Sequence, residues 1–282
     1  MAIQWFPGHM LETKKFLKQT IPSVDVVLEV LDARLPISSA NPLLDKICNT
    51  TPRVKVLNKK DLADPEATSQ WLAYFNEKFH GKCVAINGTD KTQTWKTVDD
   101  AVKTITRNKA RKARIMVVGI PNTGKSTIIN SLAGKKIAKT GNTPAITRQQ
   151  QRAGLKNKID IYDTPGILWP ILENQAGAFR LAASGAISDT AMDYADVAHF
   201  TAGYLLERYG AQLQKRYQLQ APFPHTANEL IEAIGTRRGC LKKGGILNWQ
   251  KASEVLIREL RIGKIGRISL EFPRDHNPQN SE

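Results

Sequence analysis

A glycine-rich segment followed by lysine and serine is the clearest sign of chemistry in this 282-residue chain. The segment Gly119-Ile-Pro-Asn-Thr-Gly-Lys-Ser126 lies between an apolar run at 115–118 and a helical pattern at 127–132, as a phosphate-binding loop requires. Its glycines let backbone N–H groups surround phosphate oxygens at a helix N-terminus, where the helix dipole favours negative charge. We expect Lys125 to reach the β- and γ-phosphates and assist catalysis, and Ser126 to bind Mg²⁺. The other predicted phosphate contacts are Asn122, Thr123, Gly124 and Thr127.

The turn Asp163-Thr-Pro-Gly166 follows an apolar strand-like run at 159–162. A carboxylate at the end of a strand beside a phosphate loop can hold Mg²⁺ through water, which is the role we predict for Asp163. The Gly166 N–H can contact a γ-phosphate and lose it on hydrolysis, so this turn is a candidate switch. Thr147, in the loop 141–147, is the predicted switch threonine that binds Mg²⁺ and takes part in catalysis, with Thr143 as the alternative.

A second motif, Asn58-Lys59-Lys60-Asp61, indicates which base is bound. The Asp61 carboxylate can accept two hydrogen bonds from the N1–H and N2–H₂ edge of guanine, an edge that adenine lacks, so GTP and GDP are favoured over ATP. Lys59 would lie along the base, and Asn58 completes the motif. Asn87, after the strand-like run 82–86, resembles the residue whose backbone contacts the guanine oxygen.

The order of these motifs and the elements around them predict the architecture. The base-recognition motif precedes the phosphate loop, which reverses the usual order, and short β-branched runs alternate with helical patterns at 66–79 and 94–107. Such alternation predicts a mostly parallel, doubly wound α/β sheet, with an antiparallel edge strand near 149–155. The predicted strands are 24–31, 53–57, 82–86, 114–118 and 159–162. Beyond 171 we find only helical patterns, at 174–187, 192–209, 228–234 and 248–261.

We therefore predict an N-terminal arm at 1–22, a circularly permuted P-loop GTPase domain at 23–170 and an all-α, basic, RNA-binding domain at 171–282. Lys and Arg outnumber Asp and Glu by 41 to 26, a surplus that suits a nucleic-acid partner, although a generally basic surface is the alternative. In the last domain, glycines flank Arg237-Arg238 and Lys242-Lys243 and would let the backbone approach an RNA phosphate.

The spacing of the cysteines and the hydropathy of the chain indicate in which cellular compartment the protein is expected. The three cysteines have no Cys-x-x-Cys spacing, which favours a reducing environment, and no apolar run is long enough for a membrane span. We expect a cytoplasmic protein without a membrane partner.

All these motifs, together with Trp5-Phe-Pro-Gly-His-Met10 and Leu31-Asp-Ala-Arg-Leu-Pro36, make the chain resemble the circularly permuted GTPases of the ribosome biogenesis GTPase A (YlqF) family. The resemblance covers the whole chain. It implies a GTPase that acts late in assembly of the large ribosomal subunit, with rRNA rather than DNA as its principal partner. It also implies that the ribosomal particle stimulates a low intrinsic rate of hydrolysis.

The position after Gly166 is Ile167, where Ras-like enzymes place the glutamine that orients the attacking water. The resemblance implies that His9 takes this role; alternatively, His9 is structural or contacts RNA. Asn122 is associated in related GTPases with a K⁺ ion that supplies positive charge to the phosphates, or it simply stiffens the loop. Two other functions stay open: a nucleotide-gated RNA-binding module with little catalysis, and a GTPase acting on another structured RNA.

Overall fold

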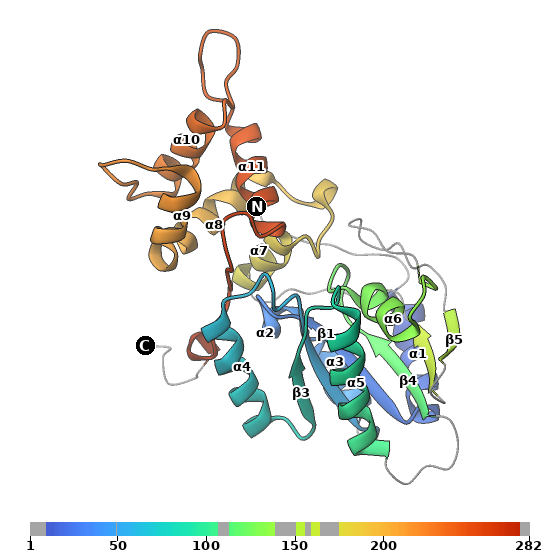
Figure 1. Cartoon of the computed structure of the whole chain (residues 1–282). Coiled ribbons are helices and arrows are strands. Elements are labelled where there is room, and N and C mark those ends of the chain that lie inside the picture. The colour runs from blue at the N-terminus through green and yellow to red at the C-terminus, as the bar shows by residue number, and fades with distance from the viewer. Residues whose placement is uncertain are drawn as a thin grey trace. The chain divides into compact units, whose positions relative to one another are not determined.

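The computed structural model describes residues 10–48, 50–106, 113–138, 151–155, 159–163 and 175–276, which form two compact units (Figure 1). Of these residues, 10–163 and 271–276 belong to the first unit and 175–270 to the second. The chain therefore leaves the first unit before residue 175 and returns to it between Leu270 and Glu271.

The first unit is built on a six-stranded sheet in the order β3-β2-β1-β4-β6-β5. All neighbouring strands are parallel except β5, which runs antiparallel to β6 at the edge. The predicted α/β fold with one antiparallel edge strand is confirmed, and strand ends differ from the predicted ones by one or two residues. The strands are β1 (Val26–Asp32), β2 (Arg53–Asn58), β3 (Lys82–Ala85), β4 (Ala113–Val118), β5 (Gln151–Leu155) and β6 (Ile159–Asp163).

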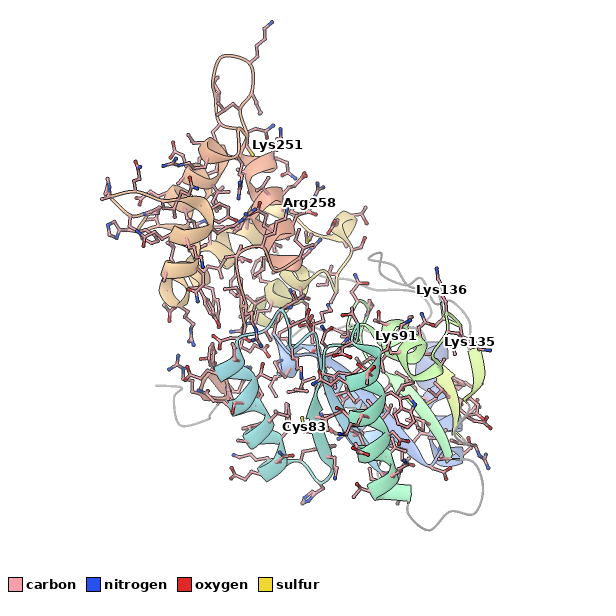
Figure 2. All side chains as sticks on the ribbon, viewed as in Figure 1. Cys83, Lys91, Lys135, Lys136, Lys251 and Arg258 are labelled. Carbon is pink, nitrogen blue, oxygen red and sulfur yellow. The ribbon has the colours of Figure 1, made fainter. Side chains whose placement is uncertain are left out.

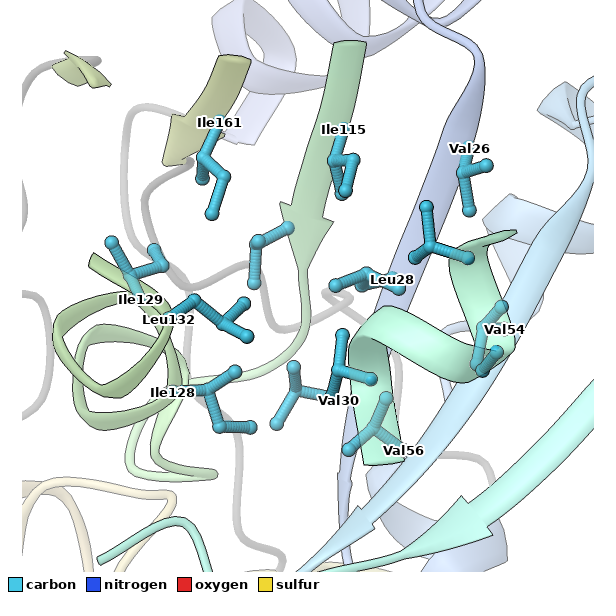
Figure 3. Close-up of a cluster of buried hydrophobic side chains, with 14 of the residues drawn as sticks. Val26, Leu28, Val30, Val54, Val56, Ile115, Ile128, Ile129, Leu132 and Ile161 are labelled. Carbon is cyan, nitrogen blue, oxygen red and sulfur yellow. The ribbon is translucent and has the colours of Figure 1, made fainter. Parts of the chain in front are cut away.

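Alternate side chains of the central strands enter different apolar clusters, because successive residues of a strand point to opposite faces. Val26, Leu28 and Val30 pack with α5 and α6, and Figure 3 shows the α6 side chains Ile128, Ile129 and Leu132 pointing toward these strands. The helices of the first unit are α1 (Met10–Thr20), α2 (Pro36–Ser39), α3 (Pro42–Ile47), α4 (Pro65–Lys78), α5 (Lys91–Thr106) and α6 (Lys125–Ala133), with 3₁₀ turns η1 (Ile21–Ser23) and η3 (Pro273–His276).

The segment predicted as an N-terminal arm is folded from Met10 onward. Leu17 and Ile21 are each only 1% exposed and pack with Val27 and Met116 on the face of the sheet opposite α5 and α6. The α/β unit thus includes α1, and the expected boundary at residue 23 is wrong because these two apolar side chains belong to its core.

The second unit is helical, as predicted. α8 packs against α7, α10 and α11, and its buried residues Val197, Thr201 and Leu205 recur at the spacing of one helix face. The helices are α7 (Gln175–Ser184), α8 (Tyr194–Arg208), α9 (Gly210–Tyr217), α10 (Ala227–Arg237) and α11 (Trp249–Arg261), with the 3₁₀ turn η2 (Asp189–Ala191). Among the residues that the structure describes, no helix is both long and apolar enough to cross a membrane.

The last described residues do not belong to the helical unit, to which 171–282 was assigned from the sequence. Glu271 is fully buried in the α/β unit, where its carboxylate accepts hydrogen bonds from the backbone N–H of Ile37 (2.9 Å) and of Ser38 (3.1 Å) and from the Ser38 hydroxyl. The Trp71 indole N–H donates to the Glu271 carbonyl at 3.1 Å. These contacts fix the returning chain against α2 and α4.

Candidate functional site

The glycine-rich segment joins β4 to α6 in a conformation that only glycine fits. Gly119 and Gly124 have φ values of 156° and 91°, which L side chains rarely adopt. A Cβ on Gly119 would lie 2.4 Å from the Val30 carbonyl oxygen, and one on Gly124 would lie 2.2 Å from Asn58 Nδ2. The loop is therefore packed against the ends of β1 and β2, as a backbone cradle for phosphate requires.

Lys125 and Ser126 occupy the first turn of α6, where free backbone N–H groups and the helix dipole favour an anion. Lys125 is 7% exposed, and its Nζ donates to the Ile120 carbonyl at 2.9 Å, across the loop. The Thr123 hydroxyl donates to the same carbonyl at 3.1 Å. Thr127 and Ser126 are half-buried in this turn. The predicted phosphate contacts 122–127 are thus brought together on one loop and helix start.

Asn58 connects the base-recognition motif to two other loops. Its Nδ2 donates to the Thr123 carbonyl in the phosphate loop at 2.7 Å, and its Oδ1 accepts from the Gly88 N–H at 2.8 Å. The Ser131 hydroxyl on α6 donates to the Gly88 carbonyl at 2.8 Å. Asn58 is 3% exposed, so these bonds are shielded from water. One buried amide therefore fixes the base loop, the phosphate loop and the loop after β3 relative to one another.

Lys59 forms an ion pair with Asp32, which is also bound by Arg34, and the sequence alone does not reveal this contact. Its backbone has φ = 63°, and its Nζ donates to Asp32 Oδ2 at 2.9 Å, while Arg34 binds both oxygens of the same carboxylate. Burial alone would raise the pKa of Asp32, but the charges and hydrogen bonds of Arg34 and Lys59 hold it well below its ordinary value. Asp61 is exposed, as a carboxylate that receives a base from solution should be.

Asn87 uses its side chain within its own turn. Its Oδ1 accepts from the Thr89 N–H at 3.0 Å and from the Thr89 hydroxyl at 2.7 Å. The neighbouring Ile86 carbonyl accepts from the Lys60 N–H at 3.1 Å, which places this turn beside the base-recognition motif. The side-chain oxygen of Asn87 is thus occupied within the turn, and the backbone contact of Asn87 with a nucleotide stays a prediction.

The predicted catalytic and metal-binding groups are only partly within the described residues. His9, Thr143, Thr147 and Gly166 lie outside them. The backbone of Asp163 ends β6 and is paired with Val117, so it lies one strand away from the start of the phosphate loop; its side chain lies outside the description. Asn122 is half-buried with φ = 60°. The roles assigned to these residues remain predictions.

Comparison with known proteins gives a consistent result. The family described as 50S ribosome-binding GTPase matches residues 114–218. The chain is 43% identical to the ribosome biogenesis GTPase A of Bacillus cereus, with 99% of this chain and 97% of that protein covered. It is 33% identical to the ribosome biogenesis GTPase A of Thermotoga maritima, with 99% and 98% covered.

Solved structures agree with the sequence relatives. The crystal structure of GNP-bound YlqF from T. maritima matches 93% of this chain and 98% of that chain, with 28% identity and a TM-score of 0.67. The GDP-bound structure of TM YlqF matches 92% and 100%, with 28% identity and a TM-score of 0.69. The matches to these relatives extend over almost the full length of both chains. The chain belongs to the ribosome biogenesis GTPase A family and is a GTPase.

Proposed function

We propose that this GTPase acts in assembly of the large ribosomal subunit and binds the subunit and its rRNA in the GTP-bound state, in the cytoplasm. The observation that carries the proposal is the match along almost the whole chain to proteins named ribosome biogenesis GTPase A, together with the 50S ribosome in the description of the matched family. The basic balance of the chain, 41 Lys and Arg against 26 Asp and Glu, supports an RNA partner.

We assign a separate role at the nucleotide to each part of the site. Asp61 would read the guanine edge, Lys59 would lie along the base, and the N–H groups of the phosphate loop with Lys125 would neutralise the β- and γ-phosphates. The glycine cradle and the half-buried Ser126 fit a phosphate-bound Mg²⁺, which prefers oxygen ligands and retains water. Mg²⁺ would be held by Ser126, Thr147 and Asp163 and would supply charge neutralisation on the phosphates.

Hydrolysis also needs a group that orients water, since Ile167 cannot. We assign this to His9, whose neutral imidazole can orient or accept from water near pH 7. Gly166 would sense the γ-phosphate and couple its loss to a change in the switch. K⁺ near Asn122 would add positive charge where negative charge develops during hydrolysis.

The helical unit offers a surface suited to RNA between α10 and α11. Residues 241–247 form a hairpin-like turn closed by the Leu241–Leu247 bridge, and Lys242 N–H donates to the Ile246 carbonyl at 2.7 Å. Lys242 and Lys243 are exposed at this turn. The exposed side chains of the turn and its flanks include Arg237, Leu241, Ile246, Trp249 and Lys251, the last of which is labelled on α11 in Figure 2. Cationic and apolar side chains together suit phosphates and unstacked bases.

Arg238, predicted with its neighbours to contact RNA, is instead occupied within the unit. Its Nη2 lies 3.3 Å from a Glu259 oxygen that also receives Arg216 at 2.6 Å, and its guanidinium lies 5.3 Å from the centre of the Tyr217 ring. Part of its charge is therefore neutralised locally. We assign the RNA contact chiefly to Arg237, Lys242 and Lys243.

Single-turnover and steady-state GTP hydrolysis, measured with and without purified large and small subunits, test the proposal. We expect large subunits to raise the turnover, and His9→Ala to remove most of this stimulation while leaving GTP affinity nearly unchanged. Binding to large subunits without stimulation would favour a nucleotide-gated RNA-binding module. Stimulation by another structured RNA, but not by large subunits, would refute the assignment of the partner.

A further inference from the structure

A buried carboxylate lies at the end of β1, next to the base-recognition motif. Asp32 is 2% exposed and is paired in the sheet with Asn58, the first residue of that motif. The Ala33 N–H donates to the Asn58 carbonyl at 2.8 Å, so the backbone connection continues past the last pair of the strands. The base-recognition motif thus begins directly beside Asp32 in the sheet.

The Asp32 carboxylate is fully used by donors from two residues. Lys59 Nζ donates to Oδ2 at 2.9 Å, and Arg34 Nη2 donates to the same oxygen at 2.8 Å. Arg34 Nε and the Arg34 backbone N–H donate to Oδ1 at 2.9 and 3.1 Å. Four donors fill the lone pairs that a carboxylate offers, and the two-pronged Arg34 contact fixes its orientation. Lys59 is therefore held by an acceptor that cannot itself rotate.

The anchored lysine lies at the start of the turn that carries Asp61. Lys59 has a left-handed backbone (φ = 63°), a conformation that costs a residue with a Cβ about 1 kcal/mol or more. The Leu62 N–H donates to the Lys59 carbonyl at 2.9 Å and closes the turn around Asp61. The ion pair with Asp32 can hold Lys59 in this conformation and so set the turn.

Arg34 has a donor left over. It is 1% exposed, and its Nη1 is buried without a hydrogen-bond partner among the described residues, whereas buried donors are nearly always satisfied. Burial opposes the charge of Arg34, but Asp32 outweighs it and, with a smaller contribution from the nearby Asp61, raises the pKa of Arg34. The guanidinium is thus a permanent positive charge that holds the Asp32 carboxylate.

We propose that Asp32 and Arg34 are positioning residues for guanine recognition: Asp32 holds Lys59 and its turn in place, and Arg34 fixes the orientation of Asp32. The inference rests on the proposed guanine-reading role of Asp61. Neither residue needs to touch the nucleotide. They act through the geometry of the turn between Lys59 and Leu62, so their loss should weaken both affinity and base selectivity.

The same two strands contain a matched control. Glu29 on β1 and Lys55 on β2 are paired in register, are 1% and 6% exposed, and form an ion pair with Nζ 2.8 Å from Oε2. Like the Asp32–Lys59 pair, which joins the last residue of β1 to the residue that follows β2, they are a buried carboxylate and a lysine. Glu29 has no contact with the base-recognition motif in the described residues. A purely structural role for Asp32 predicts that Asp32→Asn and Glu29→Gln behave alike.

The experiment measures the affinities for GDP and IDP by fluorescence titration, and the free energy of unfolding without nucleotide. IDP lacks the N2 amino group, so the GDP/IDP ratio reports how well Asp61 is placed. We expect Asp32→Asn to lower GDP affinity about tenfold or more and to lower the ratio, because an ionic hydrogen bond is lost. Glu29→Gln should leave both within about twofold. Equal nucleotide effects in the two variants would overturn the proposal.

A double-mutant cycle identifies the route of the effect. In a Lys59→Met background, Asp32→Asn should lower GDP affinity much less than it does alone; an undiminished effect contradicts the proposal. If Asp32→Asn does not fold, Asp32→Glu is the variant to use, because it retains a negative charge beside Arg34 but shifts the position of the carboxylate. An unchanged GDP affinity of Asp32→Glu would then refute the proposal. Asp61→Asn should exchange the preference for guanine for xanthine. If Asp61→Asn keeps its preference for guanine, Asp61 does not recognise the base, and this result is independent of the role of Asp32.

Discussion

Asn58→Ala should weaken both the fold and nucleotide binding, because one buried side chain connects three loops. The substitution removes the bonds to the Thr123 carbonyl (2.7 Å) and from the Gly88 N–H (2.8 Å), and both partners are buried. A buried polar group left unsatisfied costs about 1–3 kcal/mol, so the total penalty is about 2–4 kcal/mol after partial relaxation. Because the loops must meet to hold a nucleotide, we expect a drop of that size in the free energy of unfolding and at least about tenfold weaker GDP binding.

Urea unfolding without nucleotide and GDP titration measure the two effects separately. Asn58→Asp tests the donor separately, because its carboxylate can still accept from the Gly88 N–H but cannot donate to the Thr123 carbonyl. This variant should therefore bind GDP no better than Asn58→Ala. Asn41→Ala is the control, since Asn41 is equally buried (3%) and caps α3 by accepting from the Leu43 N–H at 3.0 Å. It should cost about 1–2 kcal/mol of stability and leave GDP affinity unchanged. If Asn58→Ala binds GDP as tightly as Asn41→Ala, the contacts of Asn58 are not needed to hold the nucleotide-binding loops together.

Glu271→Ala should destabilise the protein by about 3–5 kcal/mol in urea unfolding, because two backbone N–H groups lose a buried carboxylate; a loss as small as that of the exposed Glu66→Ala would contradict this. GTP turnover should be faster in K⁺ than in Na⁺ at equal ionic strength, and Asn122→Ala should abolish the difference; equal rates in wild type refute a K⁺ site. Lys242→Gln with Lys243→Gln should reduce the slope of log affinity for rRNA against log salt by about one to two, whereas Lys78→Gln on α4 should not change it; an unchanged slope would remove this turn from the interface.

The sequence predicted those features whose signal is local. The strands were placed within one or two residues because runs such as Ile115 to Val118 are continuously apolar and end at glycine or asparagine. The phosphate loop was placed because its glycines and Lys125 are adjacent in the chain. α9 was missed, since it follows α8 almost without a break and begins at Gly210, a residue that usually ends helices.

Contacts between distant segments were not predictable in this way. Glu271 binds Ser38 across 233 positions of sequence, and nothing in the composition of 262–282 distinguishes a returning segment from a helical domain's end. The Asp32–Lys59 pair depends on the register of β1 against β2, which no single motif contains. Its only local signal is a charged Asp-Ala-Arg group at the C-terminal end of a buried strand, where polar groups that serve a site are common.

Co-sedimentation with purified ribosomal subunits tests whether the protein binds the large subunit in its GTP-bound state. The full chain would be loaded with GTP, GDP or a non-hydrolysable GTP analogue and centrifuged with large or small subunits over a range of salt concentrations. We predict salt-sensitive binding to large subunits that is strongest with the GTP analogue and weakest with GDP. Binding that does not depend on the nucleotide, or that is stronger to small subunits, would contradict a GTP-dependent role on the large subunit.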